Sequence, residues 1–215
     1  MTRTLAIDVW ADVACPWCWI GERRLRGALA RLAARRPEVA VEARWRPYQL
    51  QPQLPREGAD WATFVQTKFG GEARAAGMFD HVARAGEGEG LRFRFDRVAV
   101  APNTADAHRL ILRAGERALD AADALFQAYF AEGRNVSDRG QLADLAVHWG
   151  LPREEALAFL DSDEGELEVQ GAMREARRLG IQGVPFVVLD GRLAISGAQP
   201  AELFDRALEA ALAGG

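Results

Sequence analysis

Two cysteines three positions apart are the residues of this chain whose types and spacing suggest chemistry. The segment Cys15-Pro16-Trp17-Cys18 holds both cysteines of the 215 residues, which is too few for a disulfide scaffold and makes them a pair with its own chemistry. Residues three apart on a helix lie on one face, at a separation that a disulfide bond can span. The spacing therefore predicts a redox pair that alternates between two thiols and a disulfide.

The helix that Pro16 opens should activate the first of the two sulfurs. Proline at the first helical position makes Cys15 the N-cap residue. Unpaired backbone N–H groups and the positive end of the helix dipole then face its sulfur and favour the thiolate, so we expect a lowered pKa for Cys15. Cys18 should be more buried and act second, by attacking a mixed disulfide formed at Cys15.

Two structural interpretations of the cysteine pair are disfavoured. A zinc site needs two more cysteine or histidine ligands, and the three histidines, His81, His108 and His148, are scattered through a helical region. Two incidental buried cysteines at such a turn are equally disfavoured. We therefore expect no metal and no cofactor other than the disulfide of the pair, with glutathione left open as a co-substrate.

Sequence patterns on either side of the cysteines predict a βαβ unit. In residues 5–13 every second side chain is apolar, from Leu5 to Val13, and residues 39–45 alternate in the same way. Between them, residues 16–35 carry apolar side chains at steps of three and four, as a helix with one buried face does. We expect two parallel strands with a right-handed crossover, and the cysteine pair at the start of the connecting helix.

The middle of the chain is helical by its periodicity, and strands return only near the C-terminus. Helices are expected from about residue 60 to 179, with a short extended piece at 91–95. Strands are expected over 185–189 and 193–196, followed by a final helix that Pro200 opens. Because both ends of the chain supply strands to one sheet, the helical block should be an insertion between them.

Turn and capping residues mark the boundaries of these elements. Asp190-Gly191 favours a two-residue type I′ turn between the last two strands. Asn103 and Ser137 are good N-cap residues for two helices of the middle block. Gly150 stands where a glycine ends a helix.

Composition and charge limit the classes of partner. The chain is 49% hydrophobic and 27% charged, which is ordinary for a soluble globular protein, and no uncharged stretch is long enough to cross a bilayer. Its 27 basic residues are interspersed with 31 acidic ones for a net charge of −4, which disfavours nucleic acid as a partner.

Asp8 and Asp12 interrupt any secretory signal, so we expect a cytoplasmic protein, monomeric or homodimeric. The arginines at 23, 24 and 26 should form a solvated helix face.

The cysteine motif, the interrupting helices and the segment Gly183-Val184-Pro185-Phe186-Val187-Val188 together resemble the thioredoxin superfamily, specifically the DsbA-like family with a helical insertion. Four further segments resemble its cytoplasmic FrnE-type branch: WRPYQL at 45–50, PNT at 102–104, AHRL at 107–110 and SGAQ at 196–199. The resemblance implies an α/β thioredoxin-like fold (βαβ…ββα) with a large helical insertion domain. Residues 1–50 and 180–215 would form the thioredoxin-like domain, and residues 51–179 the insertion.

The resemblance also implies a thiol–disulfide oxidoreductase that acts on protein or small-molecule thiols and disulfides. It places Pro185 beside Cys15 and Cys18 as a third catalytic residue, in a cis peptide bond that leaves the Val184 backbone free to pair with a bound polypeptide. From the sequence alone, Pro185 could equally be a trans proline at the start of a strand. The direction of electron flow stays open, since the cytosol is reducing.

Four other side chains have competing interpretations. Trp17 either contacts substrate or packs over the helix. Asn103 either only caps its helix or also contacts substrate, because that helix belongs to the insertion expected to cover the site. Asp12 is more readily a solvated turn residue than an acceptor of the Cys18 proton through water, and His108 is more readily a packing residue than a catalytic one.

Two other functions remain possible for this architecture. Kappa-class glutathione transferases and hydroxychromene-carboxylate isomerases resemble it, although they typically place a serine where this chain has Cys15. A retained Cys18 argues against that function, because a transferase needs only one activating position for glutathione. The other possibility is a holdase, a protein that binds thiol-containing clients and prevents their aggregation without turnover.

Overall fold

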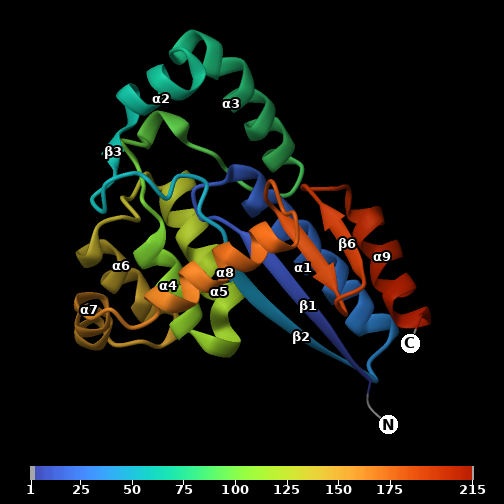
Figure 1. Cartoon of the computed structure of the whole chain (residues 1–215). Coiled ribbons are helices and arrows are strands. Elements are labelled where there is room, and N and C mark those ends of the chain that lie inside the picture. Colours follow the sequence, from blue (N-terminus) through green and yellow to red (C-terminus); the bar gives the residue numbers. More distant parts are fainter. Residues whose placement is uncertain (1–2, 215) are drawn as a thin grey trace.

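The computed structural model describes residues 3–214, and its main sheet combines strands from both ends of the chain (Figure 1). The strands lie in the order β2-β1-β5-β6. β1 (Arg3–Ala11) is parallel to β2 (Val39–Pro47) and antiparallel to β5 (Phe186–Leu189), which pairs antiparallel with β6 (Leu193–Ser196). This mixed sheet confirms the predicted α/β class. The domain limits predicted at residues 1 and 215 lie outside the described residues.

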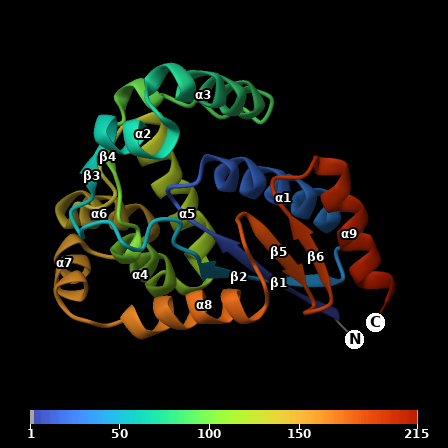
Figure 2. The ribbon, with the colours of Figure 1, turned by 45° about the horizontal axis from the view of Figure 1, so that its top comes forward.

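The helix α1 (Pro16–Arg35) joins β1 to β2, within the predicted limits of residues 16–35. Its side chains Leu25, Ala28 and Leu32 are all buried, at the spacing that one apolar helix face requires. α1 lies beside α9 (Ala201–Ala213), and both flank the sheet (Figures 1 and 2). The first helix is therefore held on two sides, which fixes its N-terminal turn at the end of β1.

Seven α-helices among the described residues lie between β2 and β5 in the chain: α2 (Trp61–Phe69), α3 (Glu72–Glu87), α4 (Ala105–Arg113), α5 (Ala118–Phe126), α6 (Arg139–Ala146), α7 (Arg153–Asp161) and α8 (Glu166–Arg178). α4, α5 and α8 pack against β2, whereas α2 and α3 form a hairpin that extends over the N-terminal end of α1 (Figure 2). A short antiparallel pair, β3 (Ala59–Asp60) with β4 (Val100–Ala101), anchors this hairpin.

An aromatic cluster joins α1 to these helices. The ring of Trp19 lies 5.1 Å from that of Phe93, edge to face, and stacks on Phe126 and Phe130 at 6.3 and 6.2 Å. Such pairs contribute about 0.5–1.5 kcal/mol each beyond the apolar area that they bury. The sheet and the helical block thus share one continuous core.

Several sequence-based boundaries need correction. The N-cap of α4 is Thr104 rather than Asn103, and that of α6 is Asp138, which accepts a hydrogen bond from the Gln141 N–H at 2.8 Å, rather than Ser137. The Ser137 hydroxyl instead accepts from the Asn103 N–H at 3.0 Å. At α6 the neighbouring Asp138 caps the helix because Ser137 is used in a contact between segments, whereas at α4 the Thr104 side chain makes no capping hydrogen bond and the Asn103 side chain still accepts from the Ala105 N–H at 3.0 Å.

Three local expectations also differ from the structure. β1 ends at Ala11, β2 continues to Pro47, and residues 91–94 form no strand. The arginine face of α1 is not simply solvated, because each arginine pairs with an acid of the helical block: Arg23 with Asp123, Arg24 with Glu89 and Arg26 with Asp120. No helix among residues 3–214 has the length and apolar character needed to span a membrane.

Candidate active site

The two cysteines lie where β1 ends and α1 begins, in a segment that we call the cysteine turn (residues 12–18). Cys15 is the N-cap residue of α1 and Pro16 follows at the first helical position, as the sequence predicts. The Cys15 N–H donates to the Asp12 carbonyl at 2.9 Å, and the Cys18 N–H donates to the Cys15 carbonyl at 3.0 Å. Both cysteines are free thiols, with exposed fractions of 5% for Cys15 and 1% for Cys18. The second sulfur is the more buried one, as expected.

Burial sets the protonation of the second thiol. The pKa of Cys18 is raised well above its ordinary value, first by burial, then by its hydrogen bond with Cys15 and by the negative charge of that sulfur. The Asp12 carboxylate raises it further through its own charge. Cys18 therefore keeps its proton at neutral pH and must lose it before it can attack a disulfide. The thiolate expected at Cys15 remains a prediction.

The loop before β5 lies against the first sulfur. Val184–Pro185 is a cis peptide bond, and the Cys15 thiol lies 3.6 Å from the Val184 carbonyl oxygen, to which it donates. Gly21 on α1 allows this loop to approach, because a Cβ atom built there would lie 2.8 Å from Pro185 Cγ. The sequence analysis missed Gly21, although a glycine inside an otherwise regular helix often marks a close contact.

Asp12 is not the solvated turn residue that the sequence analysis favoured. Its side chain is 1% exposed and accepts hydrogen bonds from the N–H groups of Leu50 at 2.7 Å and Ala14 at 3.2 Å. Its Oδ1 atom also lies 3.4 Å from Nε2 of His108. The loop after β2 and helix α4 together cover Asp12, and neither is near it in the sequence, so local pattern gave no signal of its burial.

His108 is fully buried and connects Asp12 to the sheet. Its Nδ1 accepts a hydrogen bond from Trp45 Nε1 at 3.1 Å. Its Nε2 lies 3.4 Å from the Asp12 carboxylate without a hydrogen bond to any described group, so Trp45, His108 and Asp12 form a buried polar cluster beside the cysteine turn. His108 was expected to be a packing residue, and the structure gives it this polar partner as well.

Two other predicted site residues, Trp17 and Asn103, contact different parts of the chain. The half-buried ring of Trp17 lies 5.4 Å from the ring of His81, so the cysteine turn contacts α3. Asn103 is buried, donates to the Leu54 carbonyl at 2.7 Å and accepts from Gln49 at 3.3 Å. Asn103 therefore fastens the loop after β2, and substrate contacts by Trp17 and Asn103 stay predictions.

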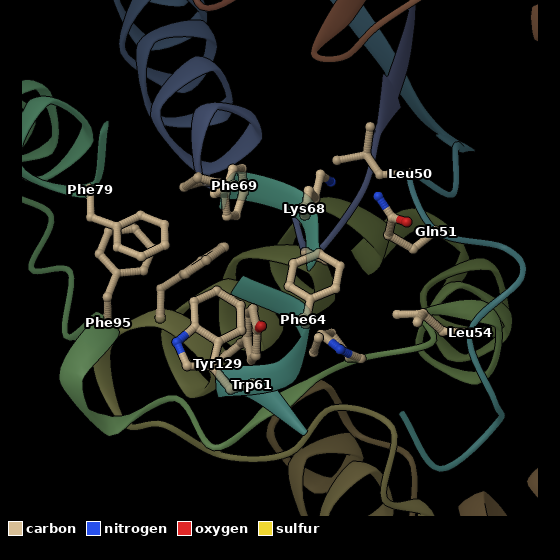
Figure 3. A pocket seen from close by; sticks show the side chains of 15 residues that line it. Leu50, Gln51, Leu54, Trp61, Phe64, Lys68, Phe69, Phe79, Phe95 and Tyr129 are labelled. Atoms are coloured by element: carbon tan, nitrogen blue, oxygen red, sulfur yellow. The ribbon is translucent and has the colours of Figure 1, made fainter. Parts of the chain in front are cut away.

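An aromatic cavity of about 120 Å³ adjoins the cysteine turn (Figure 3). Ala14 and Pro16, the neighbours of Cys15, form part of its wall. Aromatic side chains from the helical block form most of the rest: Trp61, Phe64, Phe69, Phe79, Phe95, Tyr129 and Phe130. The sequence analysis did not find this cavity, because its walls come from segments that meet only in the folded chain.

No group of three or more histidine, cysteine, aspartate or glutamate side chains within residues 3–214 is arranged to hold a metal ion. The reactive groups of the site are two thiols and a buried carboxylate, and an apolar cavity lies beside them.

Comparisons with known proteins show which family the chain resembles. A family model described as DSBA-like thioredoxin domain matches residues 6–209. The crystal structure of the probable DsbA oxidoreductase SCO1869 from Streptomyces coelicolor has a TM-score of 0.86 and 36% sequence identity, covering 98% of this chain and 91% of that one. The uncharacterized protein YwbO of Bacillus subtilis is 25% identical, over 95% of this chain and 96% of its own length.

A more distant structure shares the fold. The cytosolic disulfide reductase DsbM from Pseudomonas aeruginosa, solved with GSH, has a TM-score of 0.65 at 20% identity and covers 97% of this chain and 99% of that one. The FrnE-type branch stays a prediction. Since the family model spans almost the whole chain and the Streptomyces relative is similar along nearly its full length, this chain belongs to the family of DSBA-like thioredoxin domains.

Proposed function

We propose that this protein is a thiol–disulfide oxidoreductase in which Cys15 is the attacking sulfur and Cys18 the resolving one. The observation that carries the proposal is the position of the two thiols on the first turn of α1, with the more exposed thiol at the N-cap and a fully buried partner three residues later. Backbone N–H groups of that turn favour negative charge at the N-cap sulfur.

The reaction proceeds in two exchanges. The Cys15 thiolate attacks one sulfur of a substrate disulfide, which breaks the substrate S–S bond, releases one substrate thiolate and leaves a mixed disulfide at Cys15. Cys18 then loses its proton and attacks the Cys15 sulfur, which releases the second substrate thiolate and closes the Cys15–Cys18 disulfide. Run backwards, the same steps oxidise a substrate dithiol.

Asp12 is the proposed acceptor of the Cys18 proton, through a water molecule. Its buried carboxylate is close enough for its charge to raise the pKa of Cys18, and Nε2 of His108 lies 3.4 Å from one of its oxygens. A positioned carboxylate that takes a proton during attack contributes as a general base does. The buried polar cluster of Trp45, His108 and Asp12 would then serve the second exchange rather than the first.

The Val184–Pro185 loop is the proposed place where a polypeptide substrate pairs. Because the Val184 carbonyl already faces the Cys15 sulfur, an extended peptide that pairs with this backbone would bring its own sulfur to Cys15. Small thiols such as glutathione are the proposed co-substrates, and the cytoplasm the proposed compartment.

The test of this proposal is reduction of insulin and of glutathione disulfide by the wild type and by Cys15→Ser and Cys18→Ser variants. We expect Cys15→Ser to abolish turnover, because no mixed disulfide can form at the N-cap. Equal activity of Cys15→Ser and the wild type would remove the proposal.

The two alternative functions give different results in the same preparation. Tight stoichiometric binding of glutathione without redox turnover would indicate a glutathione-dependent transferase or isomerase. Suppression of client aggregation that survives loss of both cysteines would indicate a holdase. The retention of the buried thiol of Cys18 supports the redox function over both, since neither alternative uses a resolving sulfur.

A further inference from the structure

Lys68 is the only lysine among the 215 residues, and it lines the aromatic cavity beside the cysteine turn. It stands near the end of α2 with its ammonium nitrogen 5.1 Å from the ring centre of Phe64 and 5.7 Å from that of Phe69. Within the described part of the chain, no carboxylate lies within ion-pair distance of this nitrogen. A cation over aromatic rings without a carboxylate partner is a group to which an anionic ligand can bind.

The position of Lys68 relative to the sulfur follows from its electrostatics. Burial lowers the pKa of Lys68, while the negative charges of Asp12 and of Cys15 act on it in the opposite direction. The lysine therefore lies within electrostatic reach of the attacking sulfur. The residue as a whole is exposed to solvent, so the ammonium stands at the border between water and the aromatic walls.

The cavity itself suits one small apolar group. Apolar cavities of about 150 Å³ are known to hold a benzene molecule, and this cavity measures about 120 Å³. The rings of Phe64, Phe79 and Phe95 surround it (Figure 3). The Tyr129 hydroxyl donates to the Val100 carbonyl at 3.2 Å, so it is already satisfied. Lys68 is the one charged side chain among the described residues of the wall.

We propose that this cavity is a substrate subsite of the cysteine pair for small disulfides and thiols that carry an aromatic ring and a carboxylate. The ring enters between the aromatic walls, the carboxylate pairs with Lys68, and the sulfur extends past Ala14 and Pro16 to Cys15. In the reaction, the Cys15 thiolate attacks the nearer sulfur of the aryl disulfide and one aryl thiolate leaves. Cys18 then loses its proton, closes the Cys15–Cys18 disulfide and releases the second aryl thiolate.

This inference rests on the proposed function. A pair of probes tests the subsite separately from the oxidoreductase function. Dithiobis(nitrobenzoate) is an aryl disulfide with a carboxylate on each ring, whereas dithiodipyridine is an aryl disulfide without one. Pre-reduced protein is mixed with each probe, and the release of coloured thiol is followed in a single turnover. The reduced protein supplies both electrons, so no further reductant is needed.

Lys68→Met should slow the reaction with dithiobis(nitrobenzoate) by roughly tenfold, because one charge-assisted contact is lost. The rate of the reaction with dithiodipyridine should stay within about twofold of the wild-type rate. Lys68→Arg should retain most of the wild-type rate because it keeps the charge. Arg74→Met is the matched control: it removes an exposed cation from the neighbouring helix α3, outside the cavity wall, and should change neither probe.

The outcomes distinguish the two proposals. If the reduced wild type reacts with neither probe, the oxidoreductase function itself is wrong. If it reacts with both, and Lys68→Met slows both equally or neither, the oxidoreductase function stands and the subsite is wrong. If Arg74→Met slows the anionic probe as much as Lys68→Met does, long-range attraction explains the preference and the subsite is again wrong.

A second measurement needs no catalysis. Because Lys68 is the only lysine, acetylation of its amine can be followed by mass spectrometry against the N-terminal amine as internal reference. Nitrobenzoate should protect Lys68 from acetylation, and the neutral nitrobenzamide should not. Equal acetylation with and without nitrobenzoate would overturn the subsite.

Discussion

At the residue scale, the carboxylate of Asp12 is the group that distinguishes the two exchanges of the cysteine pair. It is buried, it is held by two backbone N–H groups and it faces His108. Its charge raises the pKa of Cys18, which by itself makes the second thiol harder to ionise. Because the Asp12 charge hinders ionisation of Cys18, Asp12 can speed the second exchange only if its carboxylate also accepts the Cys18 proton.

Asp12→Asn tests this role because its two effects have opposite signs. Loss of the charge alone would lower the pKa of Cys18 and speed the second exchange, whereas loss of the proton acceptor would slow it. We expect the resolving step to slow at neutral pH by on the order of 10²-fold, with little change in the attack by Cys15. Rapid-quench measurement of the mixed disulfide reports both steps, and a faster resolving step in the variant would contradict the role of Asp12.

At the scale of one element, α1 both presents the sulfurs and crosses the border between the sheet and the helical block. Glu22 lies on its buried side, one turn after Cys18, with Arg26 as its close ion-pair partner. Burial raises the pKa of Glu22 from 4.5 to about 7, although Arg26 acts against that rise. The helix α1 therefore carries, besides the two cysteines, the carboxyl group of Glu22, whose ionisation costs free energy in the folded protein.

This pKa predicts how stability depends on pH. The folded pKa lies above the unfolded one, so the unfolded chain releases the Glu22 proton first and the free energy of unfolding falls as pH rises from about 4.5 to about 7. A rise of about 2.5 units corresponds to roughly 3 kcal/mol. In urea unfolding of the reduced protein at pH 5 and pH 8, Glu22→Gln should lose less stability between the two pH values than the wild type, by about that amount. Parallel losses in the two proteins would show that Glu22 does not titrate in this range.

At the scale of the whole molecule, the sheet positions the sulfurs and the Val184–Pro185 loop, and the helical block supplies His108 and the aromatic cavity. β1 and β5 bring the cysteine turn and the Val184–Pro185 loop together. The hairpin of α2 and α3 adds the aromatic cavity and contacts Trp17 through His81. If the proposed subsite is correct, a change in the hairpin alters the choice of small substrate and leaves the thiol chemistry unchanged.

The parts that the sequence predicts are those with a local signal. Alternation over residues 39–45 marks β2, the Asp190-Gly191 turn marks the start of β6, and the cysteine–proline pair marks the start of α1. Asp12 and Gly21 have no such signal, because Asp12 is buried by Leu50 and His108, and Gly21 is needed by Pro185, all of which lie far away in the chain. The cavity is missed for the same reason, since its walls come from segments that are far apart in the sequence.

Trapping of the mixed disulfide tests the central claim most directly. The reduced Cys18→Ser and Cys15→Ser variants are each mixed with a peptide disulfide, and the products are measured by intact-mass spectrometry. We predict a stable peptide adduct on Cys15 in the Cys18→Ser variant and none on Cys18 in the Cys15→Ser variant, because the N-cap thiol attacks while its buried neighbour stays protonated. An adduct on Cys18, or equal adducts on both sulfurs, would contradict the assignment of attacking and resolving thiols.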